Sequence, residues 1–130
     1  MKTTLHTGII VDVPTATGIT YVRKAVEHAI NDMSLNESIR RGRMIGGLLD
    51  RKNEHISQVQ NATHVVHGIF ISNGELLVDV QILDTPTGKE VQKMLVAGKK
   101  VTAKLIIDVP MGVRNVINVP FRIMQVQLEC

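Results

Sequence analysis

The chain has 130 residues, 44% of them apolar, which is enough for a single domain with one buried core. A net charge of +3 and only three aromatic residues, Tyr21, Phe70 and Phe121, argue against a specific nucleic-acid partner. No apolar run approaches the ~20 residues that span a bilayer, and the single cysteine, Cys130, excludes an internal disulfide, so we expect a soluble, intracellular protein with no membrane partner.

The first part of the chain predicts a strand, a turn and a helix. Residues 4–13 are β-branched and apolar and are expected to form a strand, which residues 14–18 end as a turn. Thr20 is a suitable N-cap for the helix that follows. The helix is marked by one apolar stripe at i, i+3 and i+4 spacing: Val22, Ala25, Val26, Ala29, Ile30 and Met33.

Residues 36–61 are polar and rich in glycine, and they predict mostly loop. Within them, residues 44–49 are apolar enough for a short strand, interrupted by Gly46 and Gly47. The one dense basic run, residues 40–43, falls in this region. We expect it to be either a solvated loop or a contact surface for an acidic partner.

A β-hairpin is the clearest prediction in the centre of the chain. Residues 62–71 and 76–83 flank Asn73-Gly74, a pair that adopts the positive φ angles of a type I′ turn. Strand alternation places one set of apolar side chains on a buried face and leaves the other face half solvated. The buried set is Leu76, Val78, Val80 and Ile82.

The last third of the chain predicts one helix and two strands. Thr87 and Glu90 have the spacing of a capping box, and Gly98 suits the residue that ends a helix. The apolar stripe between them consists of Val91, Met94 and Leu95. Residues 101–107 and 117–128 follow as strands, and Pro120 suits an edge or bulge position.

The fold class is therefore α+β and mainly β, with residues 1–130 forming one domain. We expect a mostly antiparallel β-barrel or sandwich of six to seven strands with two helices.

Several segments, taken in order, indicate a family. Gly18 and Tyr21 lie in a turn before a helix, Thr63-His64-Val65 stands near the start of a strand, and residues 83–88 read "LDTPTG" before the next helix. Over roughly residues 8–104 this order resembles the prohead core serine proteases of tailed bacteriophages. The resemblance implies a herpesvirus-protease-like (assemblin-like) fold, a β-barrel surrounded by helices.

The catalytic residues that the resemblance implies are missing. Arg51-Lys52 stands in place of a histidine-proline pair, and Thr102-Ala103-Lys104 stands where the family carries its nucleophilic serine. The last serine of the chain is Ser72, so no serine lies on the expected strand or after it.

A serine-type hydrolase needs a hydroxyl within hydrogen-bond reach of an imidazole, which takes its proton. His64 is the best remaining base, and His55 is a substitute from the loop. Thr102 is interpreted as a strand residue that reflects β propensity, because an internal threonine lacks the free α-amine that activates threonine nucleophiles.

No cofactor or metal site is predicted. His64 and His67 are three residues apart, which places them on opposite faces of a strand, so they cannot converge on one ion without a bulge. The Gly88-Lys89 pair lacks the upstream glycine of a phosphate-binding loop.

These observations favour a non-catalytic structural protein of a tailed-phage head, assembled in the host cytoplasm and retained in the virion. Its expected role is decoration or cement protein, with the major capsid protein as partner and a homodimer as a possible form. Candidate contact residues are Arg40, Arg41, Arg43, Arg51, Lys52, Phe121 and Ile123, with residues 116–128 as an edge strand. The alternatives are an active maturation protease, an internal scaffold or core protein, and a nucleic-acid-binding module.

Overall fold

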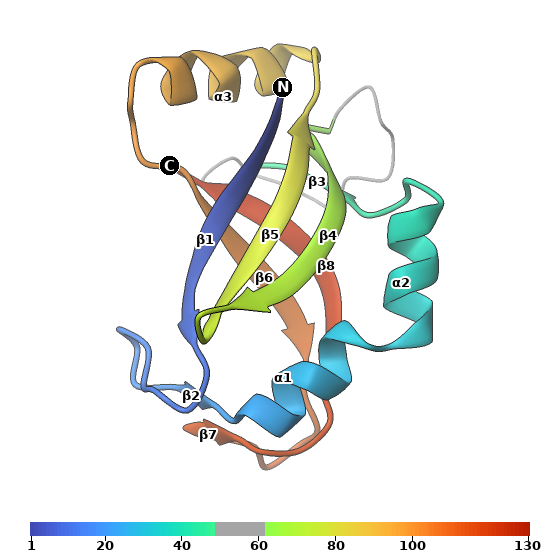
Figure 1. Ribbon diagram of the computed structural model, residues 1–130, viewed down its shortest axis with the longest axis vertical. Helices are drawn as coiled ribbons and strands as arrows, with labels where there is room; N and C mark the ends of the chain where they lie inside the picture. Colours follow the sequence, from blue (N-terminus) through green and yellow to red (C-terminus); the bar gives the residue numbers. More distant parts are fainter. Residues whose placement is uncertain (49–61) are drawn as a thin grey trace.

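The computed structural model describes residues 1–48 and 62–130, and Figure 1 shows their arrangement. The described part is α+β and mainly β, with eight strands and three helices. In chain order these are β1 Lys2–Ile10, β2 Thr20–Tyr21, α1 Arg23–Ile30, α2 Met33–Arg40, β3 Ile45–Gly46, β4 His64–Ser72, β5 Glu75–Ile82, α3 Pro86–Val96, β6 Thr102–Asp108, β7 Val116–Ile117 and β8 Arg122–Glu129. Within these residues no helix is both long and apolar enough to cross a membrane.

Two antiparallel sheets curl around one core and form a half-barrel (Figure 1). One has the strand order β1-β5-β4-β3, and the other pairs β6 with β8. The two sheets meet beside β3, where the amide of Leu128 in β8 donates to the carbonyl of Gly47 at 2.9 Å. The side chains between them include Leu5, Val66, Leu76, Val78, Val80, Val126 and Leu128, all buried.

Two predictions about the strands are corrected. The described residues form eight strands, more than the six to seven predicted, because a short parallel pair, β2 with β7, forms at one end of the molecule. In addition, residues 116–128 are not one edge strand: they split into β7 and β8, and β8 lies between β6 and the segment around Gly47. Among the described strands, the long strands β1 and β6 each pair with a single neighbour.

The central hairpin is confirmed. Asn73 and Gly74 have φ angles of 51° and 82°, and Ser72 pairs with Glu75 across the turn. The predicted inner face of β5 is buried along its whole length, and the alternate residues are half exposed. Each apolar side chain moved from water into this core contributes roughly 1.5–3 kcal/mol, and β5 is an inner strand of the larger sheet, paired with β1 and β4.

The first predicted helix is found as α1, with two differences. Val22 precedes it without a side-chain cap, because Thr20 is paired in β2 with Val116. The helix ends at Ile30, and Met33 is 86% exposed at the start of α2, not part of the buried stripe.

The short helix α2 lies where loop was predicted. Its N-cap is Asp32, whose carboxylate accepts a hydrogen bond from the amide of Ser34 at 2.8 Å. Leu35 is its one fully buried side chain, so eight residues of this helix leave almost no apolar periodicity in the sequence.

The helix α3 is confirmed, but a different threonine caps it. The hydroxyl of Thr85 accepts from the amide of Gly88 at 3.0 Å and donates to the carbonyl of Ala62. The helix starts two residues earlier than a Thr87 cap would allow, because Pro86 occupies the first turn, where no amide is needed. Gly98 has a φ of 78° and follows the helix as predicted.

Replacing Thr85 by Ala removes both of its hydrogen bonds, and we expect the free energy of unfolding to fall by about 1–2 kcal/mol in urea denaturation. Thr87→Ala is the matched control, since the Thr87 hydroxyl makes a single long contact with Thr63 at 3.4 Å. In Thr87→Ala the free energy of unfolding is expected to fall by less than about 0.5 kcal/mol. Equal losses in the two variants would contradict the assignment of Thr85 as the cap.

Candidate functional site

His64 lies at the start of β4 and is completely buried between the two sheets. Its Nε2 is 2.8 Å from the carbonyl oxygen of Val126 in β8. Because a carbonyl only accepts, Nε2 carries the proton and donates it to this bond. The other ring nitrogen, Nδ1, is buried and has no hydrogen-bond partner among the described residues.

The neighbouring strand, β3, has a glycine at the position that lies against this imidazole. Gly46 of β3 pairs with His64, and a Cβ atom at Gly46 would lie 2.1 Å from the carbonyl oxygen of Val126 and 3.0 Å from Cε1 of the ring. Only glycine allows so close an approach. Burial lowers the pKa of His64 to about 4, against a smaller opposing effect of the hydrogen bond to Val126. The imidazole is therefore neutral at physiological pH.

The segment that replaces the implied serine forms the first residues of β6. Ala103 points into the core and is 2% exposed, while Thr102 is half-buried and its hydroxyl is 3.5 Å from the carbonyl of Glu129. This end of β6 borders a pocket of about 230 Å³ that opens between β1 and β6. The lining residues are Thr7, Gly8, Ile9, Thr15, Ala16, Thr17, Tyr21, Thr102, Ala103, Lys104, Leu105 and Glu129.

A bulge in β1 opens this pocket. Gly8 has a φ of 75°, and the pairing of β1 with β5 shifts register between His6 and Ile10. Gly8 lies within the predicted strand 4–13, and a glycine inside a strand is the usual signal of a bulge. No residue of β1 was among the predicted site residues.

The pocket is rich in hydroxyl groups but holds no imidazole among the described residues. Tyr21 is half-buried there, and desolvation raises the pKa of its phenol, so the phenol remains protonated. His64 does not line the pocket, and its Nε2 proton is already committed to Val126. The described geometry therefore brings Thr102 together with hydroxyl groups, Lys104 and Glu129, but not with an imidazole.

The basic run is partly neutralised. Arg40 and Arg41 both contact the carboxylate of Glu37, at 2.7 Å and 2.5 Å, and these contacts hold the pKa of that carboxyl below its ordinary value. Arg43 is exposed. The remaining basic candidates, Arg51 and Lys52, and the substitute base His55 lie outside the described residues.

The two apolar contact candidates are corrected. Phe121 and Ile123 are 2% and 5% exposed, because they point into the core from the start of β8. Phe121 stacks edge-on against Tyr21, with ring centroids 6.0 Å apart. A partner would instead meet the exposed Arg122 and Met124 of the same strand.

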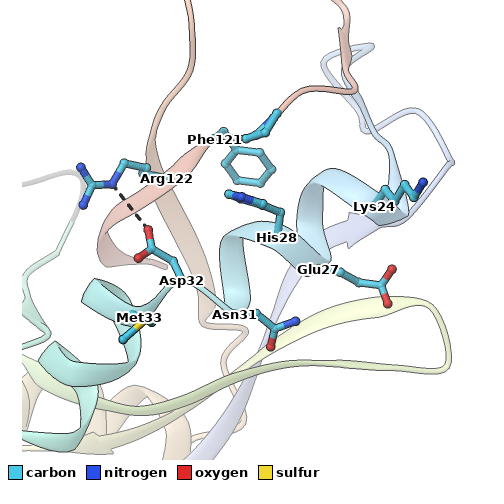
Figure 2. A pocket seen from close by; sticks show the side chains of 9 residues that line it. Lys24, Glu27, His28, Asn31, Asp32, Met33, Phe121 and Arg122 are labelled. Carbon is cyan, nitrogen blue, oxygen red and sulfur yellow. Dashed lines mark ion pairs between the residues drawn. The ribbon is translucent and has the colours of Figure 1, made fainter.

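A wide groove of about 940 Å³ lies beside Phe121, between α1 and the start of β8 (Figure 2). Phe121 and His28 line its inner part, and Arg122 pairs with Asp32 at 3.5 Å on one side. Its charges are mixed, with Lys24 and Glu27 also on its wall. The groove can accommodate side chains of a partner, and the Arg122–Asp32 pair is the ion pair found among its described lining residues.

His64 and His67, which were considered as a metal pair, lie on opposite faces of β4. His64 is buried while His67 is exposed and hydrogen-bonded to the side chain of Gln81 at 3.0 Å, so the two imidazoles face opposite sides of the sheet. Among residues 1–48 and 62–130 no three metal-ligating side chains come together.

The fold is similar to that of a solved protein. The structure of the bacteriophage T4 capsid assembly protease, gp21, superimposes on this chain with a TM-score of 0.73, covering 99% of this chain and 81% of that one at 12% sequence identity. No protein-family model matches the chain, and no curated protein matches it in sequence. The likeness shows a phage-protease-like fold.

The buried imidazole predicts a pH dependence of unfolding. The folded-state pKa of His64, about 4, lies below the ~6.5 of an unfolded-chain histidine. The unfolded state therefore binds a proton first, and stability falls as the pH drops from about 6.5 to about 4. The loss from this group is on the order of 3 kcal/mol at most, measured by urea denaturation across that range.

Two glutamine variants serve as controls. His64→Gln keeps a donor for Val126 but cannot titrate, so its stability is expected to depend less on pH than that of the parent. His67→Gln changes an exposed imidazole, and we expect it to leave the slope of the free energy of unfolding against pH unchanged. Identical slopes in the parent and His64→Gln would show that His64 is not the responsible group.

Proposed function

We propose that this chain is a non-catalytic structural protein of a tailed-phage head, a decoration or cement protein that binds and stabilises the shell of the major capsid protein. Three facts support the proposal: a fold similar to that of a capsid assembly protease, no serine after Ser72, and a buried imidazole at His64. The fold alone does not carry function, so the argument depends on the site.

The observation that carries the proposal is the state of His64. A general base needs a free nitrogen lone pair directed at the hydroxyl that it activates. In His64, Nε2 donates to a backbone carbonyl, and the lone pair of Nδ1 is buried and accepts no hydrogen bond from a hydroxyl among the described residues. An imidazole in this position contributes to packing between the sheets and is unavailable to a substrate.

A binding role places the function on exposed surfaces. Arg43, Arg122 and Met124 are exposed, so they offer two positive charges and one apolar side chain to another chain. The contact is with the major capsid protein, and this chain binds either as a monomer or as a homodimer.

The second candidate function is an active maturation protease with a displaced nucleophile. The pocket beside Thr102 favours it, because this hydroxyl lies at the strand position that carries the nucleophile in the resembling family. The missing imidazole argues against it.

Labelling with a fluorescent serine-reactive phosphonate separates the two functions. We expect no covalent labelling of the parent, of Thr102→Ser or of Thr102→Ala, and no specific cleavage of capsid or scaffold substrate, because no described imidazole lines the pocket. Labelling that disappears in Thr102→Ala would establish a threonine nucleophile and overturn the proposal. If it also disappears in His55→Ala, that histidine is the base.

Mass spectrometry of mature virions tests the cement role against an internal scaffold role. A cement protein is expected in a fixed ratio to the major capsid protein, and the ratio should survive extensive washing. Its presence in immature heads and absence from mature virions would instead identify a scaffold or core protein.

A further inference from the structure

The most strongly charged surface of the described chain lies on α3 and at the start of β6. Residues 89–104 contain one acidic residue, Glu90, and five lysines: Lys89, Lys93, Lys99, Lys100 and Lys104. The five positive charges and one negative charge leave this segment more positive than the whole chain, whose formal charge is +3. The rest of the protein is therefore slightly acidic, and the positive charge is concentrated here.

The geometry of α3 directs these charges outward. Gly88 and Val91 are buried against the body of the protein, whereas Lys89, Lys93 and Val96 follow one another at i, i+4 and i+7 on the opposite side. Val96 is 78% exposed. Figure 1 shows α3 lying across one end of the molecule, well away from α1 and α2.

These lysines differ from the arginine run in having no partner. Within the described part of the chain none of the five lysine side chains forms an ion pair or a hydrogen bond, whereas Glu37 neutralises Arg40 and Arg41. The one acidic side chain within the segment, Glu90, is half-buried. The surface formed by Lys89, Lys93, Lys99 and Lys100, called the α3 lysine surface, therefore retains its charge for an external partner.

We propose that the α3 lysine surface is a docking site for an acidic amphipathic helix of a protein partner. Two lysines one turn apart match acidic residues at i, i+4 on a helix that packs alongside, and the exposed Val96 supplies an apolar contact between the charges. The 11 residues of α3 give about 16 Å of helix, enough for about three turns of such a partner.

A protein partner fits this surface better than nucleic acid does. Base recognition relies on arginine forks and aromatic stacking, and the segment 89–104 contains neither arginine nor an aromatic residue. An exposed valine among the lysines has no favourable contact with a phosphate backbone. The inference rests on charge and burial alone, and it holds whether or not the chain is a capsid component.

A direct test uses three labelled probes and fluorescence anisotropy with the full chain. The first probe is a synthetic helical peptide with glutamates at i, i+4 and a leucine on the same face. The second has glutamine in place of each glutamate, and the third is a single-stranded DNA of equal charge. We expect binding of the first probe at about 50 mM salt, weaker binding at about 150 mM, and little binding of the other two.

The variants locate the binding surface. Lys89→Glu/Lys93→Glu is expected to weaken binding of the acidic peptide at least about tenfold, since attraction becomes repulsion, and Val96→Ser is expected to weaken it less. The matched control, Arg23→Glu/Lys24→Glu, makes the same change of net charge on the exposed side of α1 and is expected to change the affinity less than about twofold. Circular dichroism and thermal unfolding confirm that each variant is folded. If Lys89→Glu/Lys93→Glu is not folded, Lys89→Gln/Lys93→Gln is used in its place.

Three results would overturn the proposal. Equal weakening by the α1 and α3 variants would mean that only net charge matters. Tighter binding of DNA, lost in Lys89→Glu/Lys93→Glu, would make α3 a nucleic-acid surface. No binding of the acidic peptide at about 50 mM salt, where charge attraction is strong, would leave α3 without this partner.

Discussion

One hydrogen bond, from Nε2 of His64 to the carbonyl of Val126, stands where the two curled sheets meet. The β1-β5-β4-β3 sheet and the β6-β8 pair are separate ladders, and their approach at this point requires Gly46, because any side chain there would overlap the same carbonyl. The net gain from such a bond is about 1 kcal/mol, but leaving the buried carbonyl unpaired would cost roughly 1–3 kcal/mol. Together with the bond from the amide of Leu128 to the carbonyl of Gly47, a neutral imidazole at His64 therefore stabilises the junction of the half-barrel.

The same bond decides what chemistry the interior can perform. In this tautomer of His64, Nε2 carries the proton that binds Val126, and the lone pair on Nδ1 is buried and accepts no hydrogen bond from a described residue. The pocket beside Thr102 is a separate space, formed by the bulge at Gly8, and its described lining supplies hydroxyl groups and Lys104. Within this phage-protease-like fold, His64 therefore packs between the two sheets and lies apart from the pocket beside Thr102.

Local signals predicted much of this fold. The Asn73-Gly74 turn and the alternation along β5 located the hairpin, since turn geometry and strand periodicity are both properties of adjacent residues. The eight-residue helix α2 was not predicted because it buries Leu35 alone. The cap of α3 was misplaced because the spacing of Thr87 and Glu90 was followed, although Pro86 suits the first helical position after a cap at Thr85. The burial of His64 depends on a strand 62 residues away, which no local pattern reveals.

Surface charge shows most clearly that a local sequence pattern does not reveal which side chains the fold brings together. The run at residues 40–43 is the densest basic stretch, yet Glu37 lies one helical turn before it and binds both Arg40 and Arg41. Lys89 and Lys93 of α3 are separated by three residues of mixed polarity and form no conspicuous run, but the helix gathers both on one face and leaves their side chains unpaired within the described structure. The density of charge along a sequence therefore counts the charged side chains. The charge available to a partner depends on which of these side chains the fold has already paired.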